Sequence, residues 1–156
     1  MNIKIIAVGK IREKYIKMGI DEFVKRIQPY SSLQIIEISS ENIYSDSNID
    51  KILDIEAEKI LKQAGENSYF IVMDIKGKQL SSEDFAAKIK DISLSGINQV
   101  VFIIGGAEGL SEKVKNRADF SMSLSSMTFV NQMARFFLLE QIYRAFKIIN
   151  NEPYHK

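Results

Sequence analysis

The chain of 156 residues contains no cysteine and a single histidine, His155. Without cysteine, the sequence excludes disulfide bonds, thiolate nucleophiles and every zinc or iron–sulfur site that needs thiolate ligands. One histidine leaves few ligands for other transition metals, and no closely spaced loop of Asp, Asn and Gly residues of the calcium-binding kind is present. We therefore expect no metal site.

Long apolar runs and an excess of charge of one sign are also missing. No apolar stretch approaches the roughly 20 residues that cross a bilayer, and the first run, IKIIAVG from Ile3, is too short for a signal peptide. We expect a cytoplasmic protein without membrane contacts. With 21 basic and 20 acidic side chains the net charge is +1, so an RNA-binding surface would have to be local.

The chain has only two prolines, no low-complexity stretch and no repeat, which favours one globular domain over residues 1–156. Short β-rich runs alternate with longer amphipathic ones. The expected strands are Ile3 to Val8, Leu33 to Ile38, Tyr69 to Asp74, Gln99 to Ile104 and Phe120 to Leu124. Because runs such as FIVM and VVFII are apolar throughout, the sheet should be mostly parallel and covered by helices on both faces. The fold class is α/β.

Helical spacing of apolar residues fills the intervals between these strands. The predicted helices include Ile16 to Ile27, Ile52 to Ala64, a helix that opens at Ser81 and a short one from Leu110 to Ala118. Ser81 and Asp84 have the spacing of a capping box. The polar stretch from 41 to 50 is expected to be a surface loop.

The last predicted helix, Asn131 to Ile149, has apolar side chains around nearly its whole circumference. Such a helix is buried on all sides. A small sheet covers only one of its faces, so a second copy of the chain is expected on the other, and we predict a homodimer. The alternative is a central helix of a monomer.

The segment GGAEG, residues 105–109, follows a predicted strand and precedes a predicted helix. Ligands bind at this place in many α/β proteins. The spacing matches neither the dinucleotide-binding pattern nor the phosphate loop of nucleotide-binding proteins. A ligand site and a tight turn that needs glycine for its own geometry are both open at this point.

Several longer stretches carry a resemblance that covers nearly the whole chain: KIIAVGKIREKY, GKQLSSEDFA, IGGAEGL, LSSMTF, EQIYRAFKI and the terminal PYHK. Together they resemble the ribosomal RNA large subunit methyltransferase H family, which belongs to the knotted SPOUT methyltransferases. The resemblance implies a homodimer with a C-terminal trefoil knot, an exception to the rule that chains are unknotted.

The activity that the resemblance implies is the methylation of N3 of a pseudouridine in helix 69 of the 23S ribosomal RNA. The cofactor would be S-adenosyl-L-methionine, bent within the knot, and the substrate would be the assembled 70S ribosome. A nucleotide-dependent enzyme that uses GGAEG on phosphates, and a non-catalytic dimer that binds ribosomes, are the alternative functions.

The residues that the resemblance assigns to the cofactor lie in three places. They are Met73, Gly105 and the run Leu124, Ser125, Ser126, Met127, Thr128 and Phe129. Main-chain groups of an irregular loop can bind an adenine edge without a particular side chain. The family usually continues with Pro-His-Gln, where this chain has Val130, Asn131 and Gln132. We expect Asn131 to cap the helix through its side-chain oxygen.

The catalytic assignments also rest on the resemblance. The terminal Tyr154 and His155 would fold over the cofactor, Tyr154 to orient the base and His155 to accept a proton or bind the base. Taken alone, a histidine next to the end of a chain is usually in a frayed segment. Arg144 either reaches a phosphate or the cofactor carboxylate, or pairs with Glu140 one helical turn earlier.

Overall fold

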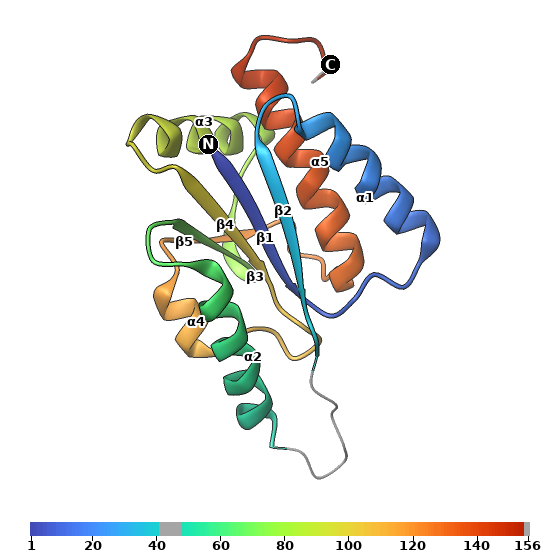
Figure 1. The fold of residues 1–156 in the computed structure, drawn as a ribbon, viewed down its shortest axis with the longest axis vertical. Coiled ribbons are helices and arrows are strands. Elements are labelled where there is room, and N and C mark those ends of the chain that lie inside the picture. The colour runs from blue at the N-terminus through green and yellow to red at the C-terminus, as the bar shows by residue number, and fades with distance from the viewer. Residues whose placement is uncertain (41–47, 155–156) are drawn as a thin grey trace.

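A computed structural model describes residues 1–40 and 48–154. Its centre is a five-stranded sheet in the order β2-β1-β4-β3-β5, in which every neighbouring pair is parallel (Figure 1). The strands are β1 Asn2–Val8, β2 Ser32–Ile38, β3 Tyr69–Gln79, β4 Gln99–Ile104 and β5 Phe120–Ser123. The predicted α/β class, with five strands in a parallel sheet, is confirmed.

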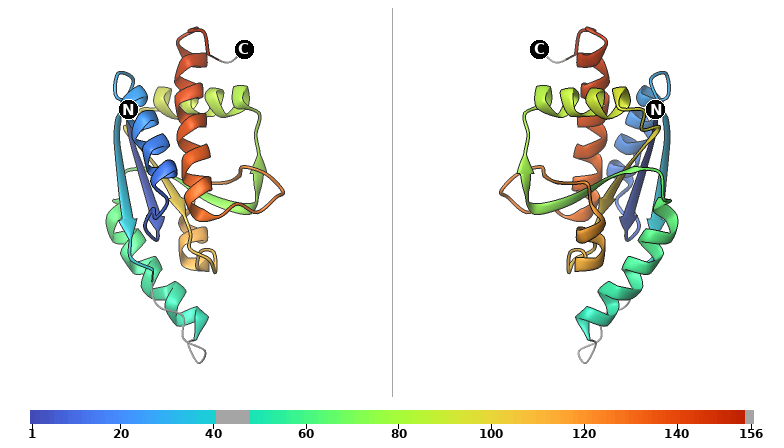
Figure 2. Two further views of the ribbon diagram at one scale, coloured as in Figure 1. Left: turned by 90° about the vertical axis from the view of Figure 1, so that its right-hand side faces the viewer. Right: turned by 90° about the vertical axis from the view of Figure 1, so that its left-hand side faces the viewer.

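Helices cover both faces of the sheet because its strands bury side chains on both sides. Ile3, Ile5 and Ala7 of β1 point into one core, while Ile6 and Val8 point into the other. The first core is closed by α1 Lys14–Ile27, α3 Ser82–Leu94 and α5 Asn131–Ile149 (Figure 2). The second is closed by α2 Ile49–Ala64 and α4 Glu112–Arg117. This arrangement follows from near-continuous apolar strands.

The helix boundaries follow local capping chemistry. Ser81 caps α3 through its hydroxyl, which accepts from the backbone N–H of Asp84 at 3.0 Å, as the spacing predicts. Asn48 caps α2 in the same way, so the last two residues of the predicted loop at 41–50 are helical; residues 41–47 lie outside the described part of the chain. Helix α5 has the predicted bounds.

Strand β3 is longer than the sequence predicts. Its ladder with β5 is interrupted between Met73 and Lys78 and then resumes at Met122 and Ser123. A side chain at Gly77 would place its Cβ atom 2.7 Å from the backbone of Met122, so only glycine allows the second stretch of pairing. The interruption leaves the residues after Met73 free to line a hollow.

Candidate functional site

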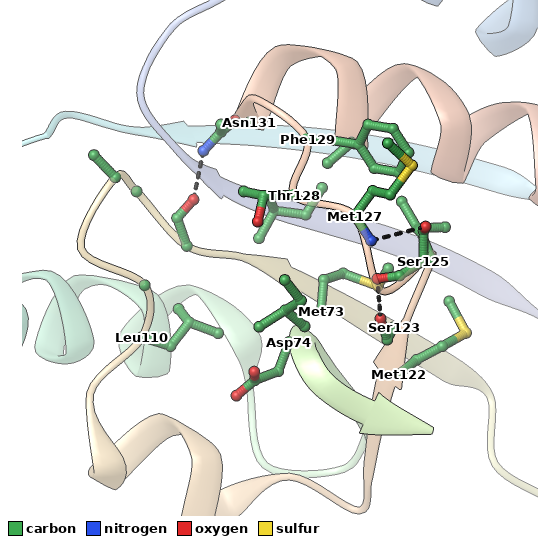
Figure 3. Close-up of a pocket in the computed structure, with 18 of the residues that line it drawn as sticks. Met73, Asp74, Leu110, Met122, Ser123, Ser125, Met127, Thr128, Phe129 and Asn131 are labelled. Atoms are coloured by element: carbon green, nitrogen blue, oxygen red, sulfur yellow. Dashed lines mark hydrogen bonds between the residues drawn. The ribbon is translucent and has the colours of Figure 1, made fainter. Parts of the chain in front are cut away.

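A pocket of about 280 Å³ lies where the ladder of β3 with β5 is interrupted, at the carboxyl end of β4 and beneath the loop that follows β5 (Figure 3). Its volume is close to the lower end of the range of small-molecule sites, about 300 to 1,000 Å³. Seven of the eight residues assigned to the cofactor line it: Met73, Gly105, Leu124, Ser125, Met127, Thr128 and Phe129. Ser126 belongs to the same loop but not to the lining. The structure thus brings together three segments that are far apart in the sequence.

The glycine segment forms one wall as a tight turn. Gly106 and Gly109 are bridged, with the N–H of Gly109 donating to the carbonyl of Gly106 at 3.2 Å, and Gly109 has a φ of 84°. A Cβ atom at Gly105 would lie 2.5 Å from the carbonyl oxygen of Gly109. The glycines are needed for the geometry of the turn. The same turn also lines the pocket, so a tight turn and a ligand site are compatible interpretations of this segment.

The loop after β5 forms the opposite wall and leaves much of its main chain without internal partners. Within the described part of the chain, residues 125–129 make no backbone–backbone hydrogen bond. The loop is held by side chains instead: the hydroxyl of Ser123 donates to the carbonyl of Ser125 at 2.8 Å, and the N–H of Met127 donates to the hydroxyl of Ser125 at 3.0 Å. Its remaining N–H and C=O groups are available to a ligand.

Apolar side chains complete the lining, among them Met73, Leu110, Met122 and Phe129. Phe129 packs against Phe137 of α5, with 5.1 Å between the ring centroids. An apolar wall with main-chain polar groups at its edge suits a flat heterocycle that has hydrogen-bonding groups at its rim.

Only two charged residues occur among those that line the pocket, Asp74 and Lys115, and the sequence analysis missed both. The Lys115 ammonium lies 3.2 Å from Oδ2 of Asp74, while Oδ1 of Asp74 accepts from the N–H of Lys76 at 3.0 Å. The Lys76 hydrogen bond, with that of Lys115, lowers the pKa of Asp74. Burial alone would lower the pKa of Lys115, but its contacts with Asp74, and with Glu112 at 3.6 Å, outweigh burial and the pKa is raised.

Asn131 departs from its predicted role. Val130 is the capping residue of α5, without a side-chain hydrogen bond, and Asn131 is the first residue of the helix. Its Nδ2 atom donates to the carbonyls of Val8 at 2.6 Å and Gly105 at 2.5 Å. The prediction of a cap through the Asn131 oxygen is wrong, because the amide is drawn to two carbonyls that end β1 and β4.

The oxygen of Asn131 is used by Arg135, whose Nη2 donates to it at 2.7 Å. Arg135 is only 1% exposed and also bonds Glu37 at 2.8 Å and the carbonyl of Gly9 at 3.0 Å. Burial lowers the pKa of Arg135, against the opposing charge of Glu37. Its Nε atom is buried without a hydrogen-bond partner among the described residues. Arg135 therefore links the Asn131 side chain to the backbone just after β1.

Of the predicted catalytic residues of the tail, Tyr154 lies away from this pocket. The hydroxyl of Tyr154 donates to Glu140 at 3.2 Å, and its ring packs edge-on against Tyr143, with 4.8 Å between centroids. Tyr143 is nine residues beyond Ala134, which lines the pocket, so about 13 Å of helix separates them. The tail leaves the far end of α5 (Figure 2), and His155 lies outside the described residues.

Arg144 takes the pairing with Glu140, its Nη2 atom lying 2.5 Å from Oε1, and its guanidinium stacks over the ring of Tyr154 at 4.8 Å. Burial, followed by the charge of Glu140 and its hydrogen bond, raises the pKa of Tyr154. The Tyr154 hydroxyl is therefore neutral at physiological pH and acts as a donor.

Among the described residues, no group of three or more His, Asp or Glu side chains is placed to hold a metal ion. None of the described helices is long and apolar enough to span a membrane.

Comparisons with known proteins agree on one family. A family model described as "Predicted SPOUT methyltransferase" matches residues 1–155. Proteins named "Ribosomal RNA large subunit methyltransferase H" from Halothermothrix orenii and Clostridioides difficile are 51% and 50% identical, over 100% of both chains. A solved structure, a probable methylase family protein from Haemophilus influenzae, is similar in fold, with a TM-score of 0.56 at 12% identity. That match covers 99% of this chain and 70% of the other.

Proposed function

Because the chain belongs to the SPOUT methyltransferase family, with the ribosomal RNA large subunit methyltransferase H proteins among its relatives, we propose that it methylates large-subunit ribosomal RNA. The proposed reaction is the transfer of a methyl group from S-adenosyl-L-methionine to N3 of a pseudouridine in helix 69 of the 23S RNA. The proposed substrate is the assembled 70S ribosome, and the proposed active form is a homodimer. The family implies the C-terminal trefoil knot.

The observation that carries this proposal is the pocket between the glycine turn and the loop at 124–129. Its apolar side chains suit the faces of an adenine ring, and the free main-chain groups of residues 125–129 suit its polar edge. Met73, Gly105 and the loop would hold the cofactor. When bound, S-adenosylmethionine supplies a methyl group that is activated by the positive sulfur.

The protein's main contribution to such a transfer is the position of the RNA base. The N3 lone pair must attack the methyl carbon in line with the breaking carbon–sulfur bond, and the N3 proton must pass to an acceptor. The one O–H of Tyr154 donates to Glu140 within a single chain, so it would have to leave that partner to orient a uracil carbonyl. His155 remains the proposed proton acceptor or base-binding group.

The position of Tyr154 indicates which chain supplies the tail. A single chain holds Tyr154 against Glu140, Tyr143 and Arg144 of α5, away from its own pocket. The side chains of Phe137, Glu140 and Arg144 lie on one face of α5, at spacings of three and four residues, and are only half-buried. In a two-fold dimer that pairs this face with itself about an axis perpendicular to α5, which is the proposed arrangement, the two helices run antiparallel. The tail of one copy would then lie near the pocket of the other.

Exposed apolar side chains near the start of α5 support a partner on this surface. Met127 is 74% exposed, Val130 67% and Met18 of α1 72%. Burial of such side chains stabilises association. A second copy is therefore proposed to cover the outward face of α5 and the loop before it.

A second hollow lies on the other side of the glycine turn and is a proposed contact for RNA. Its volume is about 460 Å³, and it shares Gly106, Ala107 and Asn131 with the first pocket. Lys10 and Arg12 line it and suit phosphate groups, while Glu56 and Glu108 also line it and would disfavour them. With a net charge of only +1, we expect several such weak contacts to add up on the ribosome and few on a free hairpin.

Calorimetric titration tests the ligand. Wild-type protein should bind S-adenosylmethionine at micromolar concentration and should not bind ATP. The reverse preference would favour a nucleotide-dependent enzyme. Incubation with tritiated S-adenosylmethionine and 70S ribosomes from a strain without the modification then tests the activity. Incorporation of about one methyl group per ribosome, located at N3 of the pseudouridine, is expected. Cofactor binding without transfer would reject the proposal.

A further inference from the structure

Asp74 and Lys115 supply the charged side chains of a pocket whose other described lining residues are uncharged. Asp74 lies in β3 where its ladder with β5 is interrupted, and Lys115 comes from the short helix α4. Both line the pocket, and their charged atoms lie 3.2 Å apart. A carboxylate and an ammonium group side by side form a binding surface for a ligand that carries the same two charges.

The Asp74 carboxylate is held in place by two hydrogen bonds and can still accept further ones. Its Oδ1 atom accepts from the N–H of Lys76, and its Oδ2 atom accepts from Lys115. An ionised carboxylate has about four acceptor positions and a lysine ammonium has three donors. The side chain of Asp74 is 16% exposed and that of Lys115 is 34% exposed, so each retains a side that can contact a ligand.

Resting on the proposed function, we infer that Asp74 and Lys115 bind the amino-acid end of S-adenosylmethionine. Asp74 accepts from its α-ammonium group, and Lys115 donates to its α-carboxylate. The adenine and the ribose carry no charge, and the sulfonium has no N–H or O–H donor. The methionine moiety alone is a zwitterion, and charge-assisted hydrogen bonds are the strong ones.

The same helix provides a comparison within the molecule. Lys113 of α4 pairs with Asp54 of α2 at 3.3 Å, a distance close to that of the pocket pair, but both side chains are more than half exposed. This second pair does not line the pocket. Asp54→Asn and Lys113→Met are therefore matched controls for Asp74→Asn and Lys115→Met.

Binding of ligands with and without the amino-acid end tests the inference. Wild-type protein and the four variants are titrated calorimetrically with S-adenosylmethionine, S-adenosylhomocysteine and 5′-methylthioadenosine, which keeps the nucleoside and lacks the amino-acid end. Asp74→Asn and Lys115→Met should weaken binding of the first two ligands about 10- to 100-fold. Their affinity for methylthioadenosine should stay within about twofold of wild type, and the control variants should match wild type throughout.

The other possible titration results would each contradict the inference in a different way. An equal loss for methylthioadenosine would assign Asp74 to the ribose hydroxyls and overturn the inference. Unchanged affinity for all three ligands would make the pair purely structural and also overturn it. In both cases the proposed function would stand. If wild-type protein bound none of the three ligands, the proposed function would fail and the inference with it. Melting temperatures of the ligand-free variants show that each variant is folded.

Discussion

The side-chain nitrogen of Asn131 lies 2.5 Å from the carbonyl oxygen of Gly105. The first turn of the C-terminal helix is thereby hydrogen-bonded to the glycine turn that forms one wall of the pocket. The same nitrogen also reaches the carbonyl of Val8, and Arg135 holds the Asn131 oxygen. A primary amide has two N–H donors and an acceptor, and all three are used here.

Asn131→Ala should weaken both the fold and the pocket. The substitution leaves the carbonyls of Val8 and Gly105 without their side-chain donor, which costs about 1 to 3 kcal/mol of unfolding free energy. The affinity for S-adenosylmethionine should fall several-fold because the glycine turn loses a restraint. Urea unfolding and calorimetry measure the two effects. Asn131→His introduces the residue that is usual in the family that the chain resembles, and it should recover part of the stability and part of the affinity. An unchanged affinity in Asn131→Ala would show that the glycine turn does not depend on this hydrogen bond.

Arg135→Met should be among the most destabilising substitutions on α5. The guanidinium joins Glu37 of β2, the carbonyl of Gly9 and the Asn131 side chain. Its loss leaves those groups without a charged donor and should lower the unfolding free energy by about 2 to 4 kcal/mol. Arg135→Lys keeps the charge without the planar fork and should recover only part of the loss. Stability equal to wild type in Arg135→Met would contradict this role.

Phe137→Glu should separate the proposed dimer. A carboxylate on the outward face of α5 would have to be buried against a second copy, which is unfavourable. Light scattering should then report a monomer, and methyl transfer to ribosomes should be lost. Binding of S-adenosylmethionine should also weaken, because Phe137 packs against Phe129 of the pocket wall. Leu94→Glu is the control, because Leu94 is 75% exposed at the end of α3 and lies outside the proposed interface; it should remain dimeric and active.

Attachment of the C-terminal segment should depend on pH through Glu152. Its carboxylate accepts from the Tyr30 hydroxyl at 2.6 Å and pairs with Lys147. These contacts, that of Lys147 first, lower the pKa of Glu152 below 4.5. A lowered pKa in the folded state means that the attachment is complete above about pH 4.5 and is lost as the pH falls through the lower value.

Magnetic resonance measures this attachment through the ring signals of Tyr30 and Tyr154. In wild-type protein these signals should be constant near neutral pH and should shift on acidification below pH 4.5. Glu152→Gln should remove that acid transition. A transition of the same midpoint in Glu152→Gln would assign it to another group.

Much of the fold could be predicted from the sequence because the local signals agree with the tertiary structure. Apolar runs such as VVFII indicate a strand buried on both faces, and Ser81 followed by Asp84 indicates a helix start. The extension of β3 to Gln79 could not be predicted, because it depends on the close approach of Gly77 to the backbone of Met122. Such a contact between distant segments leaves no local pattern.

Part of the site could be predicted, because most of its residues lie in stretches that carry the family resemblance. Seven of the residues that the resemblance assigns to the cofactor line one pocket, but the resemblance says nothing of Asp74 in β3 and Lys115 in the short helix α4. Asp74 is the last residue of the predicted strand, at the edge where parallel sheets bind ligands, and that signal was available. Arg135 carried no such signal. It lies within the predicted last helix, and only the structure shows that it is 1% exposed.

A purified heterodimer tests the central claim, that methyl transfer occurs between the pocket of one chain and the tail of the other. One subunit carries Thr128→Trp, which fills its pocket, and the other ends at Pro153 and lacks Tyr154 and His155. Each parent homodimer should be inactive on 70S ribosomes. Differently tagged subunits are co-expressed, and the doubly tagged dimer is isolated. This dimer keeps one intact site of two and should transfer methyl groups at about half the wild-type rate. A heterodimer as inactive as its parents, or full activity in the truncated homodimer, would contradict the account.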